Sequence, residues 1–512
     1  MASENVKITI LEDDITQPQG SGTSTDVAFI PAPAYPFLLE FNADGKLIYQ
    51  LFEFKGDVNF DNDPEYVRVM TYGEGTTVKK TFCVKRLIVD RPILCDTLSE
   101  FYQRFGEVPY MMSAADATKY TSVLSIVEGD PDRSFIYATE LLQAGMSVVY
   151  RPYLTGTADI KVTEAKITTA DALKKFELLY DASETSLATF ITNFEADDVY
   201  ATALTDMNEY GVKYITSGGY PSFYRIDDKN SPIHSFYAKM LSCAATRGDA
   251  VALIDHEYTD DFELGIASTS QKSFYGPVNT TFSGAEHTEF GAMFTPWADY
   301  TCSTMPSRLA VQPMPASFGY LKCMATAIKT SPNWLAMAGV TRGKVPGIVE
   351  LNTKELLSNT IAEEYQPKYG QDGQVTSINA ITNIKPYGLT IWGNRTLKPV
   401  NETGTTATNF LNIRNMVSDI KKLSYRTAKS LMFEQDTESL WLRFKGGVSP
   451  LLEQLKSSGG VTDYKIIRGT TKYNGKPLTK GELAAVIKIF PIYAVEYFEI
   501  TVVLADNDVT IA

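Results

Sequence analysis

Residues 412–460 read NIRNMVSDIKKLSYRTAKSLMFEQDTESLWLRFKGGVSPLLEQLKSSGG, and this stretch decides the fold of the C-terminal third. Its first half repeats apolar residues at helical spacing, which predicts an amphipathic helix of about 20 residues over Asn412–Phe433. Asp436-Thr437 can cap a second helix, and Gly459-Gly460 is a common way for a helix to end. The apolar positions are Met416, Val417, Ile420, Leu423, Ala428 and Leu431 in the first helix, and Leu440, Phe444, Val448, Leu451 and Leu455 in the second.

Both ends of the chain carry the alternating pattern of a β-strand. A polar stretch, Glu12–Asp26, follows the first strand pattern and is typical of a flexible linker. A single strand on a linker cannot form a sheet by itself, so it must pair with something else, such as another chain. The alternating residues are Val6, Ile8 and Ile10 near the N-terminus, and Phe498, Ile500 and Val502 near the C-terminus.

Between these ends, helical and strand patterns alternate to about residue 350, which predicts a mixed α/β (α+β) fold. Val27–Pro33 has the composition of a buried strand stopped by prolines, whereas residues 37–90 alternate aromatic and polar residues and predict a β-rich segment. We expect helices over Thr97–Phe105 and Phe135–Leu142, and a short buried strand over Met146–Tyr150.

Charge and composition exclude several classes of protein. The chain has 512 residues and a formal net charge of -14, from 61 acidic and 47 basic side chains. Because phosphate neutralisation needs clustered Lys and Arg, this acidity argues against direct nucleic-acid binding, and equally against adsorption to anionic lipid. No run of about 18 apolar residues exists, so we expect no membrane insertion. The N-terminus lacks the pattern of a secretory signal, and five widely spaced cysteines without CxxC favour reduced thiols in a cytoplasmic compartment.

Motifs that carry chemistry are missing from the sequence. It contains no phosphate-binding loop, no GxGxxG, no GxSxG and no HExxH. Asp255-His256-Glu257 is the triplet most like a catalytic site, but a polar loop after the apolar run Val251–Ile254 is the favoured interpretation, as a loop is for His287. Alternating acidic and amide residues at 57–63 imitate the start of a calcium loop, yet Asn62 stands where such loops need Gly. We therefore predict no enzyme activity, catalytic residue, cofactor or metal.

Several segments in order resemble the tail sheath proteins of contractile bacteriophages. The similarity covers about residues 290–512, with weaker echoes at Thr25–Pro31, Thr97–Gly106 and Arg247–Asp255. Asp436 stands where Asn is usual in that family and Met337 where Pro is common, which are departures from its pattern. The segments are Phe294–Trp297, Met314–Tyr320, Asn333–Val340, Ile384–Leu397, Phe410–Arg414, Phe433–Trp441 and Phe490–Phe498.

The resemblance implies a structural subunit that polymerises around an inner tail tube and contracts to drive the tube through the host cell envelope for genome delivery. It implies homo-oligomeric stacked rings or a helix, contacts with the inner tube, baseplate and tail terminator proteins, and a place in the virion tail after assembly in the host cytoplasm. Terminal arms would complete a small sheet in other subunits, which gives a role to the six alternating residues at the two ends. The sheath of a tailless contractile injection particle, an intracellular enzyme using Asp255-His256-Glu257, and a non-contractile virion or surface protein stay open as alternatives.

With this resemblance the chain divides into a C-terminal domain, a middle α/β domain and inserted regions. We expect the C-terminal domain to hold two helices and a small sheet that the arm strands complete. The expected ranges are 1–26 for the N-terminal arm and linker, 27–36 with 91–155 and 240–365 for the middle domain, 37–90 for a β-rich insertion, 156–239 for a second insertion, and 366–512 for the C-terminal domain with its arm.

The first C-terminal helix is basic. Residues 409–468 hold ten Lys or Arg against six Asp or Glu, a local balance of +4 in an acidic chain. One interpretation is a solvated helix face; the other is that Lys421, Lys422 and Arg426 hold an acidic inner tube by salt-dependent contacts.

Overall fold

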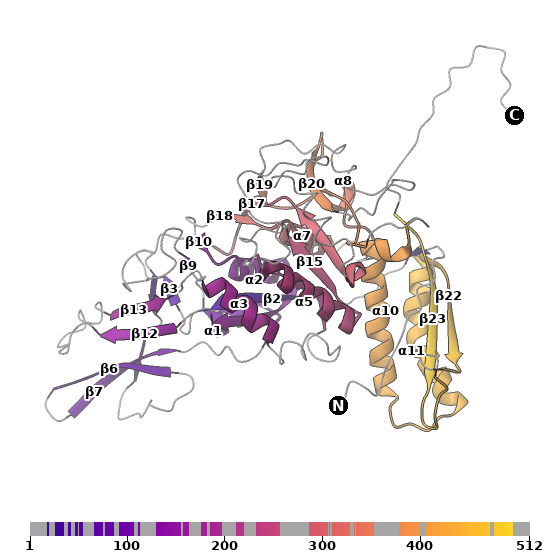
Figure 1. The fold of residues 1–512 in the computed structure, drawn as a ribbon, viewed down its shortest axis with the longest axis horizontal. Helices are drawn as coiled ribbons and strands as arrows, with labels where there is room; N and C mark the ends of the chain where they lie inside the picture. The colour runs from indigo at the N-terminus through magenta and orange to yellow at the C-terminus, as the bar shows by residue number, and fades with distance from the viewer. Residues whose placement is uncertain are drawn as a thin grey trace, which may run out of the picture.

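The computed structural model describes a mixed α/β molecule with a separate helical and β unit at one end (Figure 1). The described residues are 18–19, 26–34, 39–41, 47–49, 51–54, 66–74, 77–85, 92–106, 111–112, 130–154, 157–162, 176–181, 185–196, 211–219, 232–255, 286–352 apart from 306, 308–309, 328–331 and 333, 378–398, 405–471 and 476–494.

The body is built on an eight-stranded sheet with the order β21-β20-β16-β15-β14-β2-β11-β8. The strands from β20 to β11 run parallel, and only the edge strands β21 and β8 are antiparallel to their neighbours. The bounds are β2 Val27–Ala34, β8 Ile93–Cys95, β11 Ser147–Leu154, β14 Val212–Thr216, β15 Val251–Asp255, β16 Gly291–Thr295, β20 Asn379–Ile384 and β21 Gly388–Trp392.

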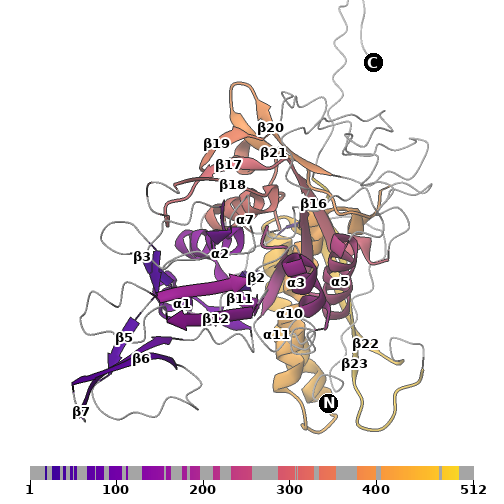
Figure 2. The same ribbon diagram turned by 60° about the vertical axis from the view of Figure 1, so that its left-hand side comes forward.

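Helices cover both faces of this sheet, so its central strands are buried on both sides (Figures 1 and 2). Alternate residues of β2 show the two layers: Ala28 and Ile30 join one core, and Val27 and Phe29 join the other. The first core includes helices α1 (Leu98–Phe105), α2 (Arg133–Ala144) and α7 (Ala316–Ala327). The second includes α3 (Thr185–Ala196) and α5 (Pro232–Arg247). The predicted α/β fold is confirmed.

Smaller sheets surround the body. β17 (Ala298–Thr301), β18 (Val311–Met314) and β19 (Ile348–Leu351) form an antiparallel sheet, and the short helix α8 (Gly339–Arg342) contacts β21. Strands β3 to β7 lie within residues 37–90, the range for which a β-rich insertion was predicted. The remaining bounds are β3 Leu39–Phe41, β4 Leu47–Tyr49, β5 Leu51–Phe54, β6 Tyr66–Glu74, β7 Thr77–Lys85, β9 Met111–Met112, β10 Asp130–Pro131, β12 Thr157–Val162, β13 Phe176–Asp181, and the 3-10 turns η4 Thr288–Phe290 and η6 Ala407–Asn409.

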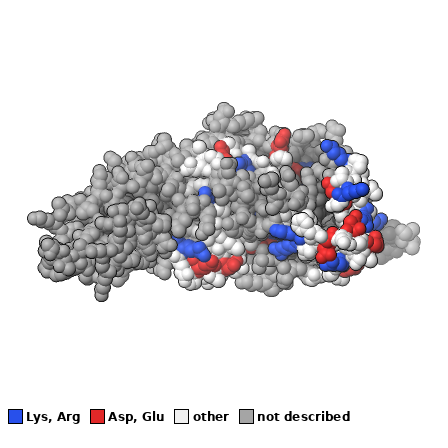
Figure 3. Space-filling model, turned by 90° about the horizontal axis from the view of Figure 1, so that it is seen from below, with Lys and Arg blue, Asp and Glu red and all other residues white. Residues whose placement is uncertain are grey.

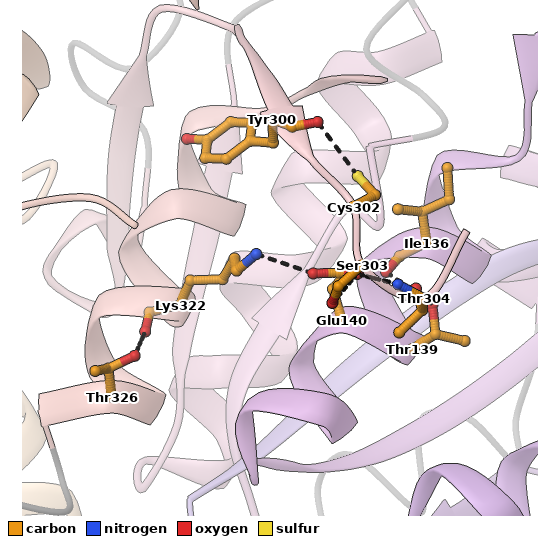
Figure 4. Close-up of polar contacts among 9 residues, drawn as sticks. All are labelled: Ile136, Thr139, Glu140, Tyr300, Cys302, Ser303, Thr304, Lys322 and Thr326. Atoms are coloured by element: carbon orange, nitrogen blue, oxygen red, sulfur yellow. Dashed lines mark hydrogen bonds and ion pairs between the residues drawn. The ribbon is translucent and has the colours of Figure 1, made fainter. Parts of the chain in front are cut away.

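A buried acid ties α2 to α7 and to the segment after β17 (Figure 4). The Glu140 carboxylate accepts hydrogen bonds from the Thr304 amide at 2.8 Å and from the Ser303 hydroxyl at 3.1 Å, and it pairs with the Lys322 ammonium at 2.9 Å. Burial alone would raise the pKa of Glu140, but the Lys322 charge and these hydrogen bonds hold it below its usual value. The first core is thus fixed by a charged contact as well as by apolar packing.

The C-terminal unit consists of two long helices and a three-stranded sheet with the order β1-β22-β23. The helices are α10 (Leu411–Ser430) and α11 (Glu438–Ser457), and the strands are β1 (Pro18–Gln19), β22 (Gly460–Gly469) and β23 (Ala484–Pro491). Both predicted helices are confirmed, including the N-cap of α11, where the Thr437 hydroxyl accepts from the Leu440 amide. Their apolar stripes meet in a third core, with members such as Ile420, Phe444 and Ile487.

Strand pairing corrects two of the expected domain boundaries. β14 lies in the middle of the large sheet, although residues 156–239 were assigned to an insertion. β20 and β21 also belong to this sheet, although residues 366–512 were assigned to the C-terminal domain. Pro18–Gln19 is a strand, although it lies inside the stretch predicted to be a linker. The rest of the domain division stays a prediction.

Candidate assembly site

The small C-terminal sheet has strand edges on which a further strand could pair. β1 pairs only with the start of β22, with Pro18 opposite Val461 and Gln19 opposite Gly460. β22 pairs with β23 on its other side along most of its length. Within the described ranges no strand pairs with β22 between Asp463 and Gly469 on the β1 side, nor with the far edge of β23. Such edges present unpaired N–H and C=O groups, which favour the addition of a strand from another chain.

One face of this sheet is covered by α11. The Tyr464 hydroxyl donates to the Glu453 carboxylate at 2.6 Å, and Arg468 pairs with Glu438. Residues on the opposite face are more open, since Lys465 is exposed and Ile467 is 44% exposed. The packed face fixes the strands in place, and among the described residues no strand covers the two edges.

The predicted arm residues cannot be compared with this sheet. Val6, Ile8 and Ile10, like Phe498, Ile500 and Val502, lie outside the described residues. The first and last described strands, β1 and β23, nevertheless belong to the same small sheet. β1 follows the N-terminal strand pattern in the sequence, and β23 precedes the C-terminal one. Strand exchange through these six residues therefore stays a prediction.

A buried ion cluster fastens α10 to the large sheet. The Lys213 ammonium on β14 lies 3.0 Å from an Asp26 oxygen and 3.0 Å from an Asp419 oxygen on α10, and the Lys213 side chain is fully buried. Although burial by itself lowers the pKa of Lys213, the two carboxylates hold it above its usual value, so this lysine carries a charge. One ammonium thus joins three segments that are distant in sequence.

The three cations proposed to hold a tube do not share one exposed surface. Lys422 is buried, and its ammonium donates to the Gly211 carbonyl at 2.9 Å. Burial lowers the pKa of Lys422 to about 8. Lys421 is partly buried beside Arg247, and only Arg426 is exposed. The expectation that all three face outward is therefore corrected, because the sheet body covers this part of α10.

Charges of both signs mix on the surface of the C-terminal unit. On the face that Figure 3 shows, Lys and Arg alternate with Asp and Glu at this end of the molecule rather than forming one continuous basic surface. Exposed ion pairs such as Lys456 with Asp463, at 2.7 Å, account for part of this mixing. A tube contact by α10 stays a prediction that depends on a few residues.

Asp255 forms a buried structural cluster. Its carboxylate accepts from the Ser317 amide at 2.9 Å and hydroxyl at 2.7 Å, and from the Ser217 hydroxyl at 3.2 Å. Burial raises the pKa of Asp255 to about 7, but the side chain has no exposed surface from which to reach a substrate. These bonds join the ends of β14 and β15 to the start of α7.

Most of the other candidate chemical residues lie outside the described part of the chain. His256, Glu257 and residues 57–63 lie outside the described part of the chain, and His287 is exposed in a turn before η4. Within the described residues, no group of three or more His, Cys, Asp or Glu side chains could hold a metal ion. No helix in that same part of the chain is long and apolar enough to cross a membrane.

Comparisons with known proteins support the resemblance seen in the sequence. No protein-family model matches the chain. The tail sheath protein of Vibrio phage KVP40 is 22% identical over 184 residues, which cover 36% of this chain and 25% of that protein. The tail sheath protein of Enterobacteria phage T4 is 21% identical over 175 residues, which cover 34% and 24%. The chain thus spans about a quarter of the length of the curated relatives it matches.

A solved structure shares the fold over nearly the whole chain. It is the PVC sheath complex of an extracellular contractile injection system in its contracted state, with a TM-score of 0.50 and 14% identity. The similarity covers 98% of this chain and 97% of that one. Together, these comparisons confirm the predicted resemblance to the contractile tail sheath family and the mixed α/β fold.

Proposed function

We propose that this chain is a structural, non-enzymatic subunit of a contractile phage tail sheath. Copies polymerise around an inner tail tube, and contraction of the polymer drives the tube through the host cell envelope. The observation that carries the proposal is the β1-β22-β23 sheet, whose described edges leave backbone groups for strands from other copies. The two curated relatives are named tail sheath proteins, which supports the same role.

Strand addition explains how a polymer could hold together while subunits move. Each subunit receives arm strands that carry Val6, Ile8 and Ile10, or Phe498, Ile500 and Val502, from its neighbours. Backbone hydrogen bonds supply affinity, and the chain on either side of each arm strand lets the bodies rotate without losing the pairing. A head-to-tail contact of this kind that does not close generates a helix or stacked rings.

The proposed partners follow from this role. They are further copies of the chain, an inner tube protein, and baseplate and tail terminator proteins at the two ends of the sheath. The subunit assembles in the host cytoplasm and resides in the virion tail. No cofactor is required, because contraction releases free energy stored in the extended polymer. The likeness to an injection-system sheath keeps a tailless particle as the alternative.

Electron microscopy of the purified chain, alone and with its inner tube protein, tests the proposal. We expect long tubes of constant diameter, and we expect a variant lacking residues 1–20 to stay folded but to form none. A folded wild-type chain that remains monomeric even with its tube would contradict the sheath role. Tubes attached to capsids in infected cells would favour a phage tail, and free tubes would favour the tailless particle.

A further inference from the structure

The outer face of the small C-terminal sheet, which is the face turned away from α11, carries two lysines in direct opposition. Along β22, Tyr464 and Ile466 pack against the third core, so the exposed Lys465 between them points outward. Its partner in the β22–β23 ladder is Lys488. Like charges directly opposite each other destabilise a pair of strands. A carboxylate on a further strand beside Lys488 would offset this repulsion.

The rest of the ladder keeps this surface basic. Asp463 is the only acidic residue in β22 and β23, and it pairs with Lys456 at 2.7 Å. Arg468 lies on the other face of β22, where its guanidinium pairs with carboxylates at the start of α11. Glu482, two residues before β23, accepts a hydrogen bond from the Thr479 amide at 2.8 Å. An added strand is therefore the natural place for the missing negative charge.

β23 also sets the apolar pattern that an added strand must match. Its inward positions belong to the third core or pack against it, and they are Leu483, just before the strand, with Ala485, Ile487 and Ile489. Its outward positions are half-buried, and they are Val486, Lys488 and Phe490. A strand on the far edge of β23 must therefore turn four alternate apolar residues inward and a carboxylate outward, opposite Lys488.

The C-terminal arm, residues 495–512, fits both demands in one antiparallel register. It lies outside the described residues, and in its sequence Glu499 interrupts an otherwise apolar alternation. With Glu499 opposite Lys488, Phe498, Ile500, Val502 and Leu504 turn inward beside Ile489, Ile487, Ala485 and Leu483, and Tyr497 and Thr501 lie opposite Phe490 and Val486. A parallel strand with the same ion pair would turn Glu496 inward beside Ala485, so the antiparallel direction is favoured.

The N-terminal arm does not fit this edge. When Val6, Ile8 and Ile10 turn inward, Lys7 turns outward. It would then add a third ammonium beside Lys465 and Lys488, which repels the strand. The two arms are thus distinguished by the sign of one outward charge.

The described end of the chain does not turn back onto its own sheet. In this register the chain's own arm would have to reverse direction between Pro491 and Glu496. The described residues 492–494 contain no turn, and the Tyr493 ring packs on Phe410 at the start of α10 with 4.9 Å between ring centroids. A strand on this edge is therefore expected from another copy.

We propose that the far edge of β23 binds the C-terminal arm of a second copy as an antiparallel strand, with Glu499 paired to Lys488. The inference rests on the proposed function as a self-assembling subunit, and it names the arm, the edge, the direction and the register. Backbone hydrogen bonds supply the affinity, and the Glu499–Lys488 pair with the inward apolar residues selects this arm over the other.

Disulfide trapping between two single variants tests the register. Val486→Cys and Thr501→Cys proteins are assembled together and oxidised, so that a crosslinked dimer reports directly opposite positions in unlike copies. The described native cysteines, Cys95, Cys243, Cys302 and Cys323, are all buried and should not compete. The matched control replaces Thr501→Cys by Thr9→Cys, an outward position of the N-terminal arm.

We expect at least about tenfold more crosslinked dimer with Thr501→Cys than with Thr9→Cys, because a disulfide needs Cβ atoms about 4 Å apart. Tubes that give the dimer mainly with Thr9→Cys, or with neither variant, would overturn the inference and leave the sheath role standing. A disulfide within one chain that carries both Val486→Cys and Thr501→Cys, formed before assembly, would also overturn it. A wild-type chain that forms no tubes, even with its inner tube protein, would overturn the proposed function and this contact with it.

A charge exchange covers the case in which the cysteine proteins fail to assemble. Lys488→Glu should raise the critical concentration for tube formation about fivefold, because an opposite-charge pair becomes a like-charge pair. Adding Glu499→Lys to the same chain should restore the wild-type value. Lys445→Glu, at an exposed position of α11, is the matched control and should leave the critical concentration unchanged. A double variant that assembles no better than Lys488→Glu would refute the pairing.

Discussion

Replacing the buried Lys213 by methionine should loosen helix α10 from the large sheet. The ammonium of this residue neutralises Asp26 and Asp419, each 3.0 Å away, and its side chain has no exposed surface. Lys213→Met removes the cation that lies beside the buried Asp26 carboxylate and the Asp419 carboxylate, which is 15% exposed. Breaking a buried ion pair from one side costs about 3–5 kcal/mol, because the remaining charge keeps its desolvation penalty. We expect a loss of this size in the free energy of unfolding.

Urea unfolding of the unassembled subunit, followed by circular dichroism, measures this loss. Hydrogen exchange gives a local readout, because amides of α10 should exchange faster once the helix is released from β14. The matched control is Lys456→Met, which breaks an exposed ion pair of 2.7 Å at the end of α11. Exposed pairs contribute little, so the control should unfold close to the wild-type midpoint.

The ion cluster also allows a compensating variant. Replacing Lys213, Asp26 and Asp419 together by apolar residues of similar size should recover much of the lost stability, because no unpaired charge remains. A Lys213→Met protein that is no less stable than Lys456→Met would refute the conclusion that this cluster fastens α10 to the sheet.

Further predictions concern pH dependence and the tube. Burial lowers the pKa of Lys422 from an ordinary 10.5 to about 8, so the unfolded chain binds more protons than the folded chain between these two pH values. The free energy of unfolding should therefore rise by up to about 3 kcal/mol from pH 8 to 10.5. Urea titrations of Lys422→Met should show no such rise. The pKa of Glu140 is lowered, so its contribution to stability is present above its ordinary pKa and is lost as pH falls through the folded value. Glu140→Gln should cost about 3 kcal/mol at pH 7, and it should reduce the fall in Tm that the wild-type protein shows when thermal melts are repeated at acid pH. Arg426→Glu should release inner tube protein at lower salt in co-sedimentation, and unchanged salt tolerance would contradict a tube contact at this exposed residue.

The two C-terminal helices could be predicted because their signals are local. Their apolar residues recur at helical spacing over twenty residues each, and Thr437 and the Gly459-Gly460 pair mark the ends of α11. β22 was not predicted, because the adjacent Ile466 and Ile467 interrupt the alternation of apolar and polar residues in the sequence. In the structure the alternation is present, since Tyr464 and Ile466 pack against the third core.

Long-range pairing could not be predicted from local patterns. β14 lies between β2 and β15 in the sheet, although β2 and β14 are separated by more than 170 residues of chain. The burial of Lys422 depends likewise on Gly211, which is 211 residues away, so helix periodicity alone could not distinguish it from the exposed Arg426. Phe433 was part of a recognised segment, but its exposure and backbone conformation became visible only in the structure.

A cryo-electron microscopy reconstruction of the assembled tubes tests the central claim most directly, because it shows which chain pairs with each edge of the C-terminal sheet. The sheath account predicts continuous density for strands from neighbouring copies along β22 between Asp463 and Gly469, or along the far edge of β23. Side-chain density should match Val6, Ile8 and Ile10 in one strand and Phe498, Ile500 and Val502 in the other. A tube in which both edges remain unpaired, or are paired only by strands of the same copy, would contradict it.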